Sequence, residues 1–257
     1  MEEKNGKFSG WHKKYASSDV IIAGAGPSGL MAALDLARLH LKTLVIERND
    51  HAGGRLWTSD FLIDTSLAAS GFREILDEFN IPYKKGKNGL YVNAGANLSS
   101  KLISAACDAG VRILNMAEFN EIIYTDGKIE GVAMNWSPAL SLEDAVRTSV
   151  SVTLKSKLVV DASGRDACVF KSLIKKGIAS TEKYSQIDLR NAQTLLLEKT
   201  GLLYPGLAVT GMAVSTIYGI PAAGLSLASL LLSGRKAAQE VELFFAEDYL
   251  GLQKRRA

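Results

Sequence analysis

The chain has 257 residues, of which 47% are hydrophobic and 22% charged, enough to bury a sizeable globular core. Its net charge of +3 is too small to indicate a nucleic-acid-binding surface, so we expect no nucleic-acid partner. No stretch approaches the ~18 apolar residues of a membrane helix, so we expect no membrane span. The polar N-terminus is unlike a secretory signal, and Cys107 and Cys168 lack metal-type spacing, so we expect a cytoplasmic protein without a disulfide scaffold.

The first part of the chain alternates helical and strand patterns. Residues 1–18 are polar with three aromatic residues at helical spacing, which predicts a helical arm. The continuous apolar run 19–23 predicts a buried parallel strand. A glycine-rich turn follows, then a helix over 30–39 and a second strand over 43–47. This β-α-β order is the unit from which parallel sheets are built.

The rest of the chain also alternates predicted helices and strands. Further helices are predicted over 72–79, 98–109 and 225–245, and further strands over 89–92, 111–114, 121–124, 129–135, 148–153, 158–161 and 207–211. Asp126-Gly127 joins two of these strands and is a hairpin signal. We therefore expect a β-rich insertion over about 119–156.

The clearest functional signal is the sequence Gly-Ala-Gly-Pro-Ser-Gly over residues 24–29, between a strand and a helix. Gly24 makes the tight turn, Gly26 lets a pyrophosphate approach the backbone, and Gly29 lets helix and strand pack closely. The helix N-terminus supplies N–H donors and partial positive charge to phosphates. Glu47, at the end of the next strand, suits ribose hydroxyls and would repel a 2′-phosphate, which favours NAD- or FAD-like ligands over NADP.

These features predict an α/β, Rossmann-like FAD/NAD-binding three-layer fold with a central parallel sheet and an added β-meander. We expect one dinucleotide-binding domain over 1–257, with the helical arm at 1–18. The paired glycines Gly53-Gly54 and the segment 161–164 are typical of flavoprotein-like folds. Met212, however, stands where those folds place a carboxylate that meets the flavin ribityl chain, which counts against FAD.

Longer motifs across residues 19–238 resemble the thiamine thiazole synthases. Besides the glycine turn, the matching segments are Glu47-Arg48, Arg73–Phe79, Gly89–Val92, Ser100–Ile103, Asn135–Pro138, Val160–Gly164, Tyr204–Leu207 and Leu231–Ala238. The sequence is therefore identified as a member of this family. Its members convert NAD and glycine, with sulfur, into an adenylated thiazole and use a bound iron.

The resemblance implies that the nucleotide contacts are kept. Ser28 would lie at the phosphate, Glu47 and Arg48 at the ribose, Phe119 at the adenine, and Met212 near the nicotinamide end. From sequence alone Arg48 is equally well a surface arginine, and Arg55 replaces a family glycine. The expected ligand is NAD or an NAD-derived adenine nucleotide, with FAD as the weaker alternative. The candidate cofactor-binding residues are Gly24, Gly26, Ser28, Gly29, Glu47, Arg48, Gly54, Arg55, Phe119 and Met212.

The resemblance also implies that the metal chemistry is lost. Arg165 stands where the family has its iron histidine, and Val150 falls at the aspartate ligand position. Neither side chain offers a lone pair to a metal. Ala222 replaces the arginine that grips the glycine carboxylate, and Cys168 is interpreted as a buried structural thiol. We therefore expect no metal and leave the catalytic residues unassigned.

Three functions stay open at this point. The first is a thiamine-biosynthesis protein that binds NAD or an adenylated thiazole or ADP-ribose-type ligand and does not run the iron-dependent reaction. The second is a non-catalytic nucleotide-binding paralogue, and the third is an FAD-dependent oxidoreductase. The family forms symmetric oligomers in which a loop reaches the neighbouring site, so we expect a homo-oligomer. In this chain the segment 137–148 occupies that loop.

Overall fold

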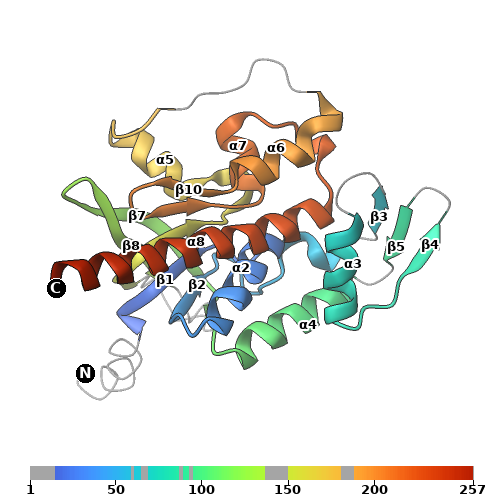
Figure 1. The fold of residues 1–257 in the computed structure, drawn as a ribbon, viewed down its shortest axis with the longest axis horizontal. Helices are drawn as coiled ribbons and strands as arrows, with labels where there is room; N and C mark the ends of the chain where they lie inside the picture. Colours follow the sequence, from blue (N-terminus) through green and yellow to red (C-terminus); the bar gives the residue numbers. More distant parts are fainter. Residues whose placement is uncertain are drawn as a thin grey trace, which may run out of the picture.

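A computed structural model describes residues 15–58, 61–64, 69–86, 89–92, 95–136, 150–180 and 188–256. A central, largely parallel sheet lies between two layers of helices (Figure 1). This confirms the predicted α/β three-layer class. Most of the expected helical arm at 1–18 and the loop at 137–148 lie outside the described residues.

The central sheet has the strand order β10-β11-β9-β1-β2-β6. Its strands are β1 (Ser17–Ala23), β2 (Thr43–Ile46), β6 (Arg112–Leu114), β9 (Val150–Asp161), β10 (Gly201–Tyr204) and β11 (Leu207–Val209). All neighbours pair in parallel except β10 and β11. The carboxyl ends of five strands therefore meet at one edge, where ligands bind in open α/β sheets.

A β-meander extends this sheet, as expected. Strands β7 (Ala117–Thr125) and β8 (Lys128–Trp136) form the predicted hairpin, and β8 pairs antiparallel with the first half of β9. The sequence pattern predicted two separate strands at 148–153 and 158–161, and this was wrong. One strand of 12 residues, Val150–Asp161, covers the described part of both. At Lys155 its partner changes from β8 to β1, and from Leu158 onward side-chain alternation gives way to a fully buried run.

The two faces of the sheet explain why its strands are apolar throughout. On β1, Val20 and Ile22 point into one core cluster, and Ile21 and Ala23 point into the other. The first cluster is covered by α2 (Pro27–Arg38), α3 (Ala69–Glu78), α4 (Gly95–Asp108) and α8 (Leu227–Arg256). The second is covered by α5 (Cys168–Lys175), α6 (Ala192–Lys199) and α7 (Met212–Tyr218). Strands buried on both faces lose the alternating pattern.

The short elements were not all predicted. A second antiparallel sheet contains β3 (Phe61–Asp64), β5 (Gly89–Val92) and β4 (Lys84–Gly86), and only β5 was expected. Helices α5, α6 and α7 and the 3-10 helices η1 (Gly54–Thr58), η2 (Gly164–Asp166), η3 (Leu189–Asn191) and η4 (Ala222–Gly224) were also missed. These missed segments of three to eight residues hold too few turns to show a clear period. Among the described residues, no helix is long and apolar enough to cross a membrane.

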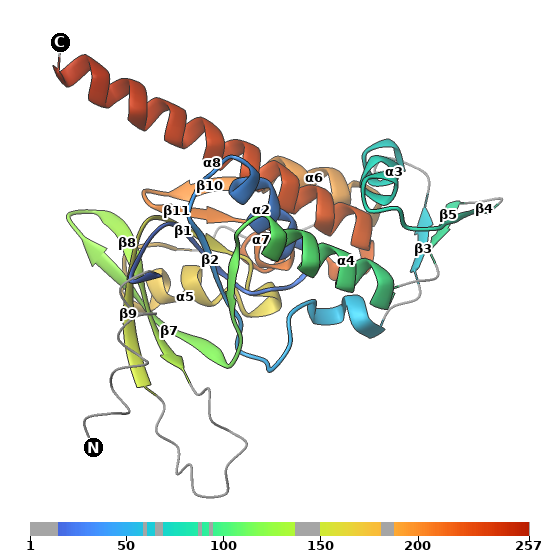
Figure 2. The ribbon, with the colours of Figure 1, turned by 90° about the horizontal axis from the view of Figure 1, so that it is seen from below.

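Helix α8 is longer than its predicted end at residue 245 and runs past the sheet toward the C-terminus (Figure 2). It packs closely on α2: a Cβ added at Gly234 would lie 2.3 Å from the backbone oxygen of Ser28. Arg235 ties the same turn to neighbouring helices, donating to Asp35 at 3.1 Å and to Glu78 at 2.6 Å. Because α2 begins at the glycine turn, this contact supports the base of the candidate site.

Gly234→Ala tests this packing. The added methyl meets backbone that cannot move aside, so we expect a loss of about 1–3 kcal/mol in the free energy of unfolding. Gly71→Ala in α3 is the matched control, because its methyl would meet only the flexible end of Leu232 at 2.9 Å. Both variants gain helix propensity. Urea unfolding that gives the same stability for both would contradict the packing argument.

Candidate functional site

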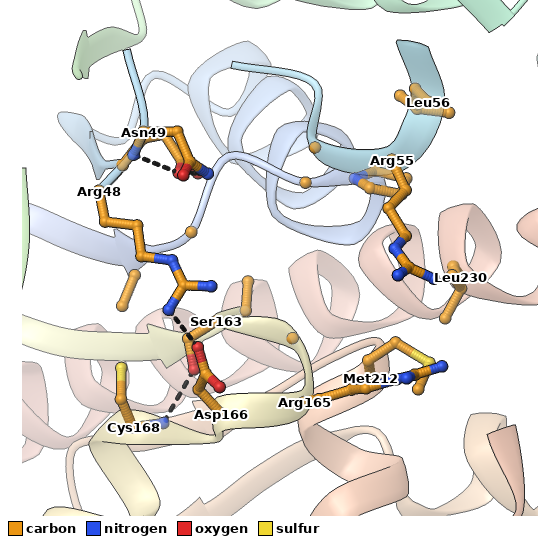
Figure 3. Close-up of a pocket in the computed structure, with 18 of the residues that line it drawn as sticks. Arg48, Asn49, Arg55, Leu56, Ser163, Arg165, Asp166, Cys168, Met212 and Leu230 are labelled. Atoms are coloured by element: carbon orange, nitrogen blue, oxygen red, sulfur yellow. Dashed lines mark hydrogen bonds and ion pairs between the residues drawn. The ribbon is translucent and has the colours of Figure 1, made fainter. Parts of the chain in front are cut away.

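A cavity of about 810 Å³ opens at the carboxyl ends of β1, β2 and β9 (Figure 3). Its walls come from the glycine turn, the tip of β2, the loop leading into η1, the turn around η2, and the starts of α7 and α8. Eight predicted site residues line it: Gly24, Gly26, Glu47, Arg48, Gly54, Arg55, Phe119 and Met212. The cavity thus gathers most of the predicted set in one place.

The glycine turn has the geometry that its sequence predicts. Gly24 has φ +109°, and a Cβ there would lie 2.4 Å from the oxygen of Ala162. A Cβ on Gly29 would lie 2.0 Å from the oxygen of Gly24, so helix and turn require a glycine at this contact. At Gly26 a Cβ would meet nothing within 4 Å. The backbone of Gly26 is therefore open to the cavity, where a ligand group can approach closely.

The start of α2 lies beside this space, because Gly26 and Pro27 line the cavity. The helix begins at Pro27, and the amide of Leu30 bonds to the oxygen of Gly26. Amides of the first helical turn have no partner within the helix and attract anions. Ser28 and Gly29 are predicted site residues that do not line the cavity. The Ser28 side chain is buried toward Gly211 and does not reach the cavity.

Glu47 is buried and already held by hydrogen bonds. Its Oε2 accepts from the amide of Ala25 at 2.8 Å, and its Oε1 accepts from the backbone amide and side chain of Asn49 at 2.9 and 2.7 Å. The carboxylate thus links the tip of β2 to the glycine turn. A carboxylate has about four acceptor positions, so it retains capacity for ribose hydroxyls.

A second glycine loop closes one side of the turn. The amide of Gly53 donates to the oxygen of Ala25 at 2.8 Å, and Gly54 lies against Gly26, where an added Cβ would come within 3.2 Å of its Cα. Trp57 holds this loop by donating from Nε1 to the oxygen of Ala52 at 2.7 Å. The backbone at Gly54 therefore forms a flat wall beside the open face of Gly26.

The opposite wall depends on a fully buried carboxyl group. Asp161 accepts hydrogen bonds from the amide and hydroxyl of Ser163 at 3.1 and 2.6 Å and from the amide of Phe170 at 3.0 Å. Burial raises the pKa of the Asp161 carboxyl, and these hydrogen bonds oppose the rise. They hold η2, which carries Arg165 and Asp166, beside the cavity.

Arg48 crosses the mouth of the cavity to the η2 turn. Its guanidinium forms an ion pair with Asp166, as Figure 3 shows. Both side chains are about half exposed, at 60% and 49%. The sequence left Arg48 open between a ligand contact and a surface residue, and the structure places it on the cavity. An exposed ion pair of this kind is worth little in stability, so it yields easily to a ligand.

Apolar side chains and two further arginines form the far end of the cavity. Met212 begins α7, and the apolar wall beside it comes from Ala222, Leu225, Leu227 and Leu230. Arg55 and Arg165 line the same cavity from η1 and η2. Phe119 lies on β7 next to a register shift between β7 and β8. A β-bulge of this kind re-aims side chains near binding sites.

Sequence reasoning omitted several lining residues from its site. Asn49, which supports Glu47, directly follows the Glu47-Arg48 pair, and this adjacency was the available signal. Ser163 lies in a segment that resembles both flavoprotein-like folds and the family, but no contact was assigned to it. Leu225 and Leu230 carried no signal, because an apolar residue at the start of a helix looks the same in a core and in a ligand cavity.

The described residues at this end of the cavity do not form a metal-binding group. Arg165 lines the cavity as a permanent cation, and a guanidinium is not a metal ligand. Cys168 also lines the cavity, but burial, with the neighbouring Asp161 carboxylate, raises the pKa of its thiol to about 12. Metals bind the thiolate. Within the described part of the chain, no three His, Cys, Asp or Glu side chains gather in a metal-type group.

Comparisons with known proteins agree with this arrangement. The model of the Thi4 family matches residues 4–226. Thiamine thiazole synthases of Aeropyrum pernix and Thermococcus kodakarensis are 38% and 36% identical to the chain, over 88% and 87% of it and 84% and 88% of their own lengths.

Two solved structures share the fold. Thermovibrio ammonificans THI4 has a TM-score of 0.77 at 24% identity, covering 95% of this chain and 96% of that one. A geranylgeranyl bacteriochlorophyll reductase-like protein of Thermoplasma acidophilum has a TM-score of 0.59 at 17% identity, covering 91% and 80%. At these identities the likeness concerns the fold alone.

Thiol labelling tests the state of Cys168. At pH 8 a thiol with a pKa near 12 is alkylated ~1,000-fold more slowly than an unperturbed one, because only the thiolate reacts. Cys107 is exposed and serves as the internal control. We expect iodoacetamide to modify one thiol per native chain and the second only after unfolding, with Cys107→Ser and Cys168→Ser assigning each signal by mass spectrometry. Equal labelling rates would contradict both the burial and the raised pKa of Cys168.

Proposed function

Because the chain belongs to the Thi4 family, we propose that it serves thiamine biosynthesis by binding NAD or an adenylated, NAD-derived ligand at the carboxyl ends of β1 and β2. The family match itself supports the role in thiamine biosynthesis. The proposal of a nucleotide ligand is supported by one observation. The backbone of Gly26 is open between the first amides of α2 and the buried carboxylate of Glu47.

Each part of the ligand has a matching group. The diphosphate would accept hydrogen bonds from the amides of Ser28 and Gly29, where the positive end of the helix dipole also favours it. The ribose hydroxyls would donate to Glu47. The adenine would lie beside Phe119 and Arg48, and the rest of the ligand would extend toward Met212. The nucleotide fits the residues present.

The iron-dependent reaction does not fit these residues. A cation at Arg165 repels a divalent metal, and Ala222 lacks the charge that would bind the carboxylate of glycine. We therefore propose that the chain binds the nucleotide without forming the thiazole. This proposal joins the first two functions considered above: the chain would serve thiamine biosynthesis, and it would do so as a non-catalytic nucleotide-binding protein. The FAD oxidoreductase is the less favoured candidate, because Met212 offers no carboxylate at the start of α7.

Other expectations remain predictions. The single domain, the cytoplasmic location and the homo-oligomer derive from the sequence pattern and the family resemblance. The loop that would reach a neighbouring subunit, 137–148, lies outside the described residues.

Gly26→Val tests the nucleotide site. A Cβ at this position would meet no neighbouring atom within 4 Å, so the fold should persist while the branched side chain fills the space for the diphosphate. We expect affinity for ADP-ribose and NAD to fall by about 100-fold, or ~2.7 kcal/mol. Isothermal titration calorimetry measures this, and a thermal melt confirms folding. Unchanged binding by a folded variant would refute the site, and tighter binding of FAD than of NAD would favour the oxidoreductase.

The loss of metal chemistry has its own test. Purified protein incubated with NAD, glycine, sulfide and ferrous iron should yield no adenylated thiazole by mass spectrometry. The Aeropyrum pernix thiamine thiazole synthase, treated identically, is the positive control. Formation of the product by this chain at a comparable rate would show that Arg165 does not prevent the reaction.

A further inference from the structure

A second cavity, of about 470 Å³, lies at the opposite end of β1 from the glycine turn. Its walls come from the start of β1, the residue before β2, the start of β8 and the middle of β9. Because a strand rises ~3.3 Å per residue, roughly 20 Å separate Ser18 in this cavity from Gly24 at the nucleotide site. Small-molecule pockets have volumes of this order. The cavity is therefore a candidate binding site distinct from the nucleotide site.

Two serine hydroxyls of this cavity have no hydrogen-bond partner among the described residues. Ser18 and Ser156 are 5% and 7% exposed, and both line the cavity. They are register partners on the parallel strands β1 and β9, so their side chains point to the same face of the sheet. Buried polar groups in proteins are nearly always paired, because an unpaired one lowers stability. The two hydroxyls thus offer neighbouring donors that the described part of the chain does not use.

The cavity also carries an excess of positive charge. Four lysines line it, from the loop before β2, from β8 and from β9: Lys42, Lys128, Lys155 and Lys157. The lining carboxylates are Asp19 and Glu130. Asp19 is already engaged, since its Oδ2 accepts from the amide of Lys42 at 2.9 Å and its Oδ1 lies 4.0 Å from Nζ of Lys157. Four ammonium groups against two carboxylates favour an anion in this space.

Neighbouring groups hold three of these lysines in place and leave them donors for a ligand. Nζ of Lys42 donates to a backbone carbonyl of β1 at 2.7 Å. Nζ of Lys128 lies 5.8 Å from the ring centre of Phe244 in α8. Nζ of Lys157 lies 5.4 Å from the ring centre of Phe245 on the same helix. An ammonium group has three N–H donors, so each of these lysines can also bond to an anion.

We propose that this cavity binds a small phosphate-bearing anion through the hydroxyls of Ser18 and Ser156 and the ammonium groups of the four lysines. Phosphate oxygens accept hydrogen bonds, and bonds from charged donors to a charged acceptor are the strong kind. The oxygens of a tetrahedral anion point in several directions, which suits donors that come from three strands and a loop. Because no hydrogen bond fixes the rotamers of the two serines, their hydroxyls can turn toward a bound oxygen.

Isothermal titration calorimetry with inorganic phosphate and with pyrophosphate tests this site at fixed ionic strength. The protein used is Gly26→Val, in which the diphosphate space of the nucleotide site is filled, so the two sites are not confused. We expect saturable binding of both ions, tighter for pyrophosphate because it reaches more of the lysines. The affinity should fall as sodium chloride rises, since most of these lysines are exposed. If Gly26→Val binds neither ion, the inference fails, and the proposed nucleotide site is unaffected by that result.

Matched variants in the same background assign the anion to the cavity. Ser18→Ala and Ser156→Ala should each weaken binding about tenfold and still fold, because each removes a buried hydroxyl without a partner. Ser99→Ala is their control, since it removes the remaining unpaired buried hydroxyl of the described residues, in α4 outside the cavity. Lys155→Gln should also weaken binding about tenfold, whereas Lys171→Gln, exposed on α5 outside both cavities, should not. Equal affinities in all five variants would show that the anion binds elsewhere and would overturn the proposal.

Discussion

The site depends on the contact between the glycine turn after β1 and the carboxylate at the tip of β2. Glu47 accepts the amide of Ala25, the carbonyl of Ala25 accepts the amide of Gly53, and Gly24 lies against Ala162 at the end of β9. Three loops from distant parts of the chain are thereby held around one open backbone position. The fully paired parallel strands beneath give these loops a rigid base.

Around this contact the two ends of the cavity differ chemically. The end at the tip of β2 combines helix amides with a carboxylate, which suits a diphosphate and a ribose. The other end presents Arg165 and apolar side chains such as Leu225 and Leu230. A divalent cation and a guanidinium both attract anions, but only the first can activate a bound group as a Lewis acid. We therefore propose a chain that binds a nucleotide and does not transform it by the family's route.

Sequence reasoning succeeded where the signals are local. The glycine turn, the apolar runs of β1 and β2 and the hairpin at Asp126-Gly127 each lie within a dozen residues, and the structure has them all. Sequence reasoning failed where a feature depends on residues that are far apart in the chain. Strand β9 is continuous because β1 and β8 both pair with it at Lys155, and Arg48 meets Asp166 across 118 positions of sequence. The convergence of Arg55 and Arg165 likewise follows from the fold and has no local pattern.

A crystal structure of the protein grown with ADP-ribose would test the central claim most directly. The account predicts diphosphate oxygens within hydrogen-bonding distance of the Ser28 and Gly29 amides and a ribose whose hydroxyls donate to Glu47. Density for the nucleotide elsewhere on the protein, or a cavity that stays empty at saturating ligand, would contradict it.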